Sequence, residues 1–325
     1  MSKIADRFKV NPSLYYAFSI AATWANAGSL LNGITISREN GSLPFLMWAI
    51  GNTLACIVFG ILAPRIPKLR EVFRSKPMKI IMGIMCPFQC WISMNGIQTV
   101  FAETPLGRTG GIIISLAIAL FFIFLLLKYG MIRNVLTDHV GWVAVYALVF
   151  AVAGIALFKY PITVPALGIA SAGIKNALLL IPGAFLYPYY YELLDYNEKN
   201  EDGTSKVNIR RAFIVGGVSF GIYLFFIYFM SFATFSPALN VIKAILVTLI
   251  ASSSLSSFLF SIYLTFGRKL GIAVNVMTVG LWQFLVPLGV MGAWTLMASI
   301  RIYIVAGAII AALIWHFASR KAAKR

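Results

Sequence analysis

The sequence has few charged residues and very few cysteines. Charged residues make up 11% of its 325 residues, and only ten residues are acidic. A soluble domain carries about 25% charged residues, so this composition, with 60% hydrophobic residues, excludes a soluble globular protein and indicates an integral membrane protein. Cys56, Cys86 and Cys90 lie inside apolar runs with no His or Asp beside them. We therefore expect packing residues there and no zinc site.

The shortage of acidic residues leaves a formal net charge of +17. In a soluble protein such a charge would point to nucleic acid. Here the basic residues cluster in short connections between apolar runs, the pattern that holds loops on the cytoplasmic side of a membrane. We therefore expect the protein to be embedded in a lipid bilayer and do not expect it to bind nucleic acid. The first apolar run is too long for a cleavable signal peptide.

Apolar runs divide the chain into about ten expected transmembrane spans, each long enough to cross a hydrocarbon core of roughly 30 Å. They are residues 12–36, 43–63, 79–101, 110–129, 139–158, 168–190, 211–235, 239–265, 272–296 and 300–317. Every second connection is strongly basic, whereas the others carry scattered charges such as Glu103 and Arg301. An even span count then places both termini in the cytoplasm, and we expect a multi-pass protein of the plasma membrane.

No low-complexity linker interrupts the spans, so we expect one transmembrane domain over residues 1–325. Its spans form two sets of five, a first repeat over about residues 12–158 and a second over about residues 168–317. The hydrophilic segment 192–211 is expected to be a cytoplasmic loop, and residues 318–325 a basic tail.

The first span has a small and polar centre, Thr23-Trp24-Ala25-Asn26-Ala27-Gly28-Ser29. Such residues allow a transmembrane helix to unwind, and unwound backbone is tolerated where it lies inside protein or lines a cavity. The carbonyl oxygens released there can bind a cation. The same residues also suit the close packing of two helices, and this stretch alone leaves both interpretations open.

The sixth span contains Pro182-Gly183 and Pro188 inside an apolar run. Proline removes a backbone donor and clashes with the preceding turn, so a kink or break is expected. Interruptions in corresponding spans of two halves indicate a secondary transporter built from inverted repeats. Two ordinary proline kinks are the alternative.

The eighth span carries five hydroxyl groups in Ser252-Ser253-Ser254-Leu255-Ser256-Ser257. Because residues three and four apart share a helix face, Ser253, Ser256 and Ser257 can line one side, with Ser254 next to Ser253. Hydroxyl oxygens are hard, neutral ligands suited to a cation of low charge, although serines also bond neighbouring helices. Opposite an unwound first helix, they favour a sodium site.

Several segments, in this order and spacing, resemble the sodium:solute symporter family, most closely its sodium/proline type. Residues 23–33 (TWANAGSLLNG) are similar to its first core helix and residues 48–65 to its second. The resemblance covers most of residues 12–265. Its other segments are 129–133 with Thr137-Asp138 before the fifth core helix, 183–188 in the broken sixth, 210–212 at the start of the seventh, and Ser253-Ser254-Leu255-Ser256 in the eighth.

The resemblance implies the leucine-transporter fold, an all-α membrane protein with two inverted five-helix repeats whose helices 1 and 6 are interrupted. It also implies a sodium ion, held by backbone carbonyls of Thr23, Asn26 and Ile250 and by hydroxyls of Ser253 and Ser254. The resemblance marks Asp138 as a candidate coupling residue. It implies a substrate site at Ala27, Gly28, Leu180, Ala184, Tyr187 and Pro188.

The sequence also departs from that family. Ala25 stands where the sodium/proline type has an acidic residue, which puts ion coupling in question. Leu180 and Ala184 replace large aromatic residues of the substrate pocket, so proline is not the expected solute. The flanking helices that most members carry have no counterpart among the ten spans.

These features predict a sodium-coupled symporter of a small organic solute, amino acid-like or another small metabolite, working by alternating access. The alternative is a non-transporting relative of the same fold, a sensor or an assembly partner, which the missing acidic residue favours. We do not expect an enzyme, because titratable residues do not cluster at membrane depth in the sequence.

Overall fold

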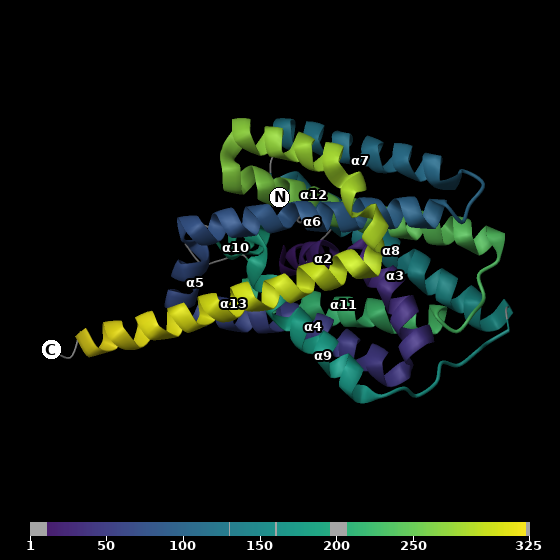
Figure 1. Cartoon of the computed structure of the whole chain (residues 1–325), viewed down its shortest axis with the longest axis horizontal. Helices are drawn as coiled ribbons and strands as arrows, with labels where there is room; N and C mark the ends of the chain where they lie inside the picture. Colours follow the sequence, from purple (N-terminus) through teal and green to yellow (C-terminus); the bar gives the residue numbers. More distant parts are fainter. Residues whose placement is uncertain (1–11, 130, 160, 196–206, 323–325) are drawn as a thin grey trace.

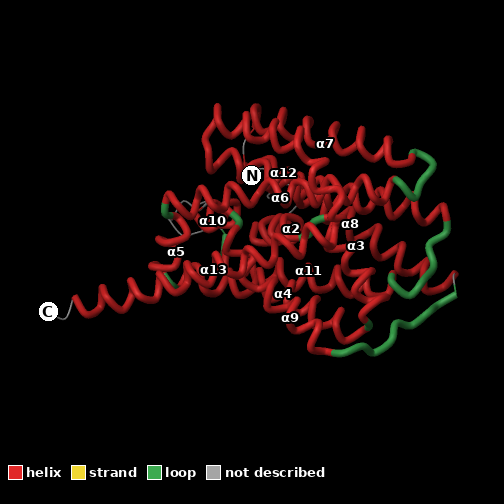
Figure 2. The backbone as a smooth tube through the Cα atoms, viewed as in Figure 1, coloured by secondary structure: helices red, strands yellow, loops and turns green. Residues whose placement is uncertain are grey.

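The structure is a computed structural model that describes residues 12–129, 131–159, 161–195 and 207–322. Nearly all of these residues are helical, and Figure 2 shows how little of the described chain lies in loops. Seven of the described helices are long and apolar enough to cross a membrane. The prediction of an all-α, multi-pass membrane protein is confirmed.

The first half of the chain forms a bundle of long helices joined by short connections (Figure 1). Its elements are α2 (Pro12–Trp24), α3 (Ala27–Thr35), the π-helical turn η1 (Ile36–Asn40), α4 (Ser42–Arg65), α5 (Pro67–Arg74), α6 (Lys76–Phe101), α7 (Gly107–Tyr129) and α8 (Met131–Lys159).

The second half packs against the first, and α12 lies along α6. Its elements are α9 (Ala170–Leu180), the 3₁₀ helix η2 (Ile181–Leu186), α10 (Pro188–Asp195), α11 (Ile209–Met230), α12 (Pro237–Leu281), the 3₁₀ helix η3 (Trp282–Leu288) and α13 (Gly289–Ala322). The far end of α13 extends beyond the other helices in Figure 1.

The predicted interruption of the first span is present between α2 and α3. Asn26 is extended there, with φ −106° and ψ 174°, and its side-chain oxygen accepts a hydrogen bond from the backbone N–H of Ser29 at 3.1 Å. Asparagine is a favoured N-cap because its oxygen satisfies an amide that the helix leaves unpaired. Asn26 therefore starts the second helical segment, after the first has ended at Trp24.

The predicted interruption of the sixth span is present as well. Tight 3₁₀ turns follow α9, Tyr187 is extended with φ −104° and ψ 105°, and α10 starts at Pro188. Proline is well accepted in a first helical turn, where its missing N–H would have had no partner. The rings of Trp24 and Tyr187 lie 5.3 Å apart, so the two interruptions are neighbours.

Close backbone approach joins the interrupted first span to α6. A Cβ built on Gly96 of α6 would lie 2.2 Å from the Cβ of Ala27. Small residues permit such contacts between membrane helices. The start of α3 is consequently fixed against the middle of α6.

The boundary predicted between the ninth and tenth spans was wrong. The preceding turn lies within α12, where the chain reverses at Gly267, whose φ is 74°. The half of α12 after this turn packs on the half before it, and the Asn275 side chain donates a hydrogen bond to the Leu259 carbonyl at 3.0 Å. The next interruption is η3, at 282–288, so residues 296–300 lie inside α13. The prediction treated Arg301 as a loop charge, but this arginine is 2% exposed and packed within protein.

Three other predicted boundaries also change. Asp138 was expected before the fifth span, but α8 already begins at Met131. The tail predicted from residue 318 is helical up to Ala322. The loop predicted over 192–211 begins after Asp195, the last residue of α10, and its residues 196–206 lie outside the described part of the chain.

Candidate functional site

A buried carboxyl group lies where α2, α8 and α12 meet. Asp138 of α8 is fully buried and accepts hydrogen bonds from the hydroxyls of Ser19, at 2.6 Å, and Ser253, at 2.9 Å. Ser19 is also 2.8 Å from the hydroxyl of Tyr189 in α10. None of the ion pairs found among the described residues involves Asp138.

This arrangement leaves the charge of a carboxylate without an opposite charge in contact. An ionised carboxyl group is costly inside a membrane protein unless a cation or a proton compensates it. Carboxylate and hydroxyl oxygens are the ligands that hard cations prefer. The described residues contain no group of three His, Cys, Asp or Glu side chains that could hold a metal ion. The oxygen set at Asp138 fits a monovalent cation or a proton.

The serines predicted to act together point to different helices. Ser253 bonds Asp138, whereas the Ser254 hydroxyl lies 2.9 Å from the hydroxyl of Ser93 in α6 and also donates to the Ala251 carbonyl. Ser257, four residues after Ser253, reaches the Thr23 hydroxyl at 2.9 Å. Ser257 and Thr23 thus line the α2–α12 contact, Ser253 faces α8, and Ser254 faces α6.

Of the three predicted carbonyl ligands, that of Asn26 already has partners, and Thr23 makes its contact with Ser257 through its hydroxyl. The Asn26 carbonyl accepts from the Ser29 N–H at 2.9 Å and from the Ser29 hydroxyl at 2.7 Å. Ile250 is 1% exposed and lies within the regular part of α12. In this conformation, therefore, side-chain oxygens are better placed for an ion than these two carbonyls.

A second polar region lies between the two interruptions. It is a cavity of about 10 Å³, room for roughly one water molecule. A chain of hydrogen bonds crosses it, from the Asn26 amide to Gln89 at 3.0 Å and from the Gln89 amide to the Tyr187 hydroxyl at 2.9 Å. The described lining residues are Trp24, Asn26, Gly28, Ser29, Trp48, Asn52, Gln89, Leu180, Tyr187, Trp294 and Arg301.

The substrate-site prediction finds half of its residues in this cavity. Gly28, Leu180 and Tyr187 line it. Ala27 instead packs on α6 through Gly96. The other two predicted residues lie nearby in the sixth span, Ala184 fully buried in η2 and Pro188 in the wall of a second cavity of about 80 Å³.

Arg301, the most polar residue of the cavity wall, was not predicted as a site residue from the sequence. It lies in α13, reaches the cavity wall, and its Nε and Nη1 atoms have no hydrogen-bond partner. Its guanidinium interacts with the Tyr187 hydroxyl. The available signal was a lone arginine inside a strongly apolar run, which marks a functional residue when the run spans a membrane.

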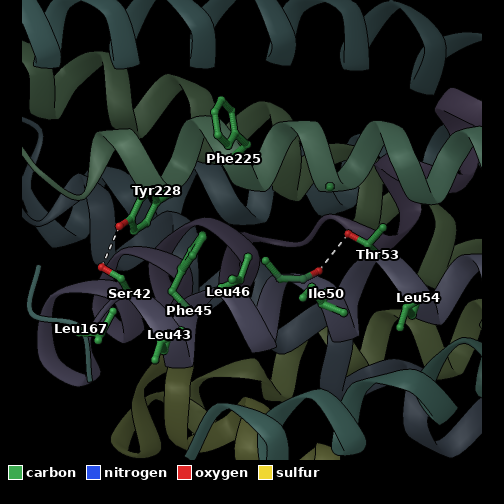
Figure 3. Close-up of a pocket in the computed structure, with 12 residues that line it drawn as sticks. Ser42, Leu43, Phe45, Leu46, Ile50, Thr53, Leu54, Leu167, Phe225 and Tyr228 are labelled. Carbon is green, nitrogen blue, oxygen red and sulfur yellow. Dashed lines mark hydrogen bonds between the residues drawn. The ribbon is translucent and has the colours of Figure 1, made fainter. Parts of the chain in front are cut away.

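A larger cavity, of about 540 Å³, opens between α4 and α11 (Figure 3). Figure 3 shows Tyr228 bonded to Ser42 at its edge, a contact of 2.7 Å, and otherwise mainly apolar side chains. Leu46, Ile50 and Phe225 are exposed there, on a side that a membrane would cover. None of the predicted site residues lines this cavity, so the candidate site is the small central one.

No family model matches the chain, and no curated protein matches it significantly. The resemblance to the sodium:solute symporters therefore stays a prediction. The features of the chain that bear on its function are the two interruptions, the cavity between them and the buried carboxyl group.

Proposed function

We propose that the protein is a secondary active transporter that couples a small organic solute to sodium by alternating access. The observation that carries the proposal is the pair of neighbouring helix interruptions, at Ala25–Asn26 and at 181–187, with a polar cavity between them. Interrupted helices at mid-membrane are the usual construction of a transporter's central site.

The proposed architecture is the leucine-transporter fold with ten spans. The first repeat consists of α2 with α3, then α4, α6, α7 and α8. The second consists of α9 with α10, then α11, the two halves of α12 on either side of Gly267, and α13. In both repeats the first span is the interrupted one, which supports the assignment. The proposal puts both termini in the cytoplasm, which the basic connections support, and the protein in the plasma membrane.

The proposed sodium site lies at Asp138, Ser253 and Thr23. The carboxylate of Asp138 stands beside a predicted serine ligand, and it supplies the negative charge that Ala25 lacks. A sodium ion bound there lies near the interruption of the first span, so its binding can stabilise one arrangement of α2 against α12. With an uncharged solute, one sodium ion moving inward across about 100 mV gains roughly 2.3 kcal/mol; the inward sodium concentration gradient drives uptake whatever the charge of the solute.

Polar contacts close the bundle at both ends of the cavity. At one end Arg70 pairs with Asp195 at 2.6 Å, which ties α5 to α10. At the other, Lys243 of α12 pairs with Glu103, the residue two positions after α6. In this proposal the small central cavity, of about 10 Å³, corresponds to a closed intermediate of alternating access, and each end opens in turn.

Uptake into liposomes tests the proposal. We expect a solute panel to reveal uptake that needs an inward sodium gradient and that the double variant Ser253→Ala, Ser254→Ala abolishes. Uptake that continues unchanged in sodium-free buffer would contradict sodium coupling.

The alternative is a non-transporting sensor or assembly partner. It is favoured by the Asn26 carbonyl, which already accepts two hydrogen bonds. This alternative predicts that sodium does not change the melting temperature and that no solute accumulates in liposomes.

A further inference from the structure

Arg301 is the only residue with a formal charge among the described residues that line the central cavity. It is 2% exposed, and two of its three guanidinium nitrogens have no hydrogen-bond partner. The indole nitrogen of Trp48, in the same wall, has no partner either. A buried charge without an opposite charge is strongly destabilising, so a protein retains one where a ligand of opposite charge binds it.

We propose that the solute is a small monocarboxylate whose carboxylate group binds the Arg301 guanidinium. This inference rests on the proposed function and names the substrate class of the same cavity. Trp48 donates its indole N–H to the same ligand.

A single negative charge best matches the wall of the cavity, which must open beyond about 10 Å³ to admit the solute. The described wall offers one positive group and no acidic group, so a monoanion restores neutrality, whereas a phosphate ester carries nearly two charges. The planar guanidinium matches the two oxygens of a carboxylate. The rings of Trp24, Trp48 and Trp294 provide apolar surface for the rest of the molecule.

The interruption of the sixth span positions the guanidinium. A Cβ on Gly183 would lie 2.9 Å from Nη1 of Arg301 and 2.9 Å from the Trp24 ring. Glycine at this position therefore lets the interrupted backbone lie directly against the arginine. A ligand on Arg301 contacts the element that must move for the cavity to open.

The two buried charges have a joint consequence. A sodium ion at Asp138 and a carboxylate at Arg301 add no net charge when both bind. Transport of one ion with one solute is then electroneutral, and the rate of uptake does not depend on the membrane potential.

Thermal unfolding of the purified full chain, at constant sodium concentration, tests the ligand class. The probes are acetate, lactate, pyruvate and benzoate, each compared with its amide. We expect at least one carboxylate to raise the melting temperature while its amide does not. Arg301→Met should lower the affinity for that carboxylate at least about thirtyfold, and Trp48→Phe should lower it roughly three- to tenfold. Arg301→Lys should retain part of the affinity. The control is Arg211→Met, an exposed arginine at the start of α11.

The response to sodium reports whether each variant is folded, and Trp48→Phe keeps the test valid if Arg301→Met does not fold. If no carboxylate raises the melting temperature, or if Arg301→Met and Trp48→Phe bind it as wild type does, the inference is overturned. Sodium-driven uptake of neutral solutes with no competition by carboxylates would overturn it as well and leave the transporter proposal standing. Carboxylate binding that needs Arg301, without sodium-driven uptake of any solute, would support the anion site and contradict transport.

Discussion

Replacing Asp138 by asparagine tests the ion site with the least change of shape. Asparagine has the size of aspartate and keeps one oxygen acceptor, but it carries no charge. The wild-type carboxyl group receives two hydroxyl hydrogen bonds, at 2.6 and 2.9 Å, and hydrogen bonds to a charged group contribute about 1.5–3 kcal/mol each. Burial of the uncompensated charge costs several kcal/mol. Because these contributions oppose each other, we expect the sodium-free melting temperature of Asp138→Asn to lie within about 3 °C of wild type.

The response of the melting temperature to sodium distinguishes wild type from Asp138→Asn. At a sodium concentration of about ten times its dissociation constant, mass action stabilises wild type by about 1.4 kcal/mol. At roughly 2–4 °C per kcal/mol, the melting temperature rises by about 3–6 °C. Asp138→Asn should show less than a quarter of this rise, because the charged ligand is gone.

Tryptophan fluorescence during heating measures both values while choline chloride replaces sodium chloride at constant ionic strength. Ser252→Ala is the matched control, since the Ser252 hydroxyl donates to the Thr248 carbonyl of its own helix at 2.6 Å. It should keep the full response to sodium. An equal response in Asp138→Asn and wild type would refute the assignment of the ion to this carboxyl group.

Three other substitutions have distinct expected outcomes. Ser254→Ala should lower sodium-driven uptake less than Ser253→Ala, because its hydroxyl bonds a serine of α6 and not the carboxyl group. Gly96→Ala should lower the free energy of unfolding by about 1–3 kcal/mol, because the new Cβ would lie 2.2 Å from a side chain of α3. Gly154→Ala is the control and should not lower it, because no atom lies within 4 Å of the added Cβ. Chemical denaturation measures the free energy of unfolding of both variants. Asp195→Asn should change stability by less than about 1 kcal/mol, as expected for a partly exposed ion pair, yet speed the labelling of cysteines introduced between α5 and α10.

The two helix interruptions could be predicted because local chemistry causes them. Proline at 182 and 188 cannot continue regular α-helical hydrogen bonding, and Asn26 caps a helix through its own side chain. The apolar runs located most spans to within a few residues for the same reason, since crossing a membrane demands a continuous apolar stretch. The partners of the serines were not predictable, because adjacent hydroxyls on one helix point to different neighbours.

Composition and local pattern thus determined that the chain is a multi-pass helical membrane protein with two interrupted spans. Tertiary structure alone decided that Asp138 meets Ser19 and Ser253, and that Arg301 lies in the cavity wall and not in a loop. The physical reason is that a charge within an apolar stretch can be accommodated either at the membrane surface or among protein groups inside. Which of the two holds depends on residues that are more than a hundred positions away along the chain, such as Tyr187 for Arg301.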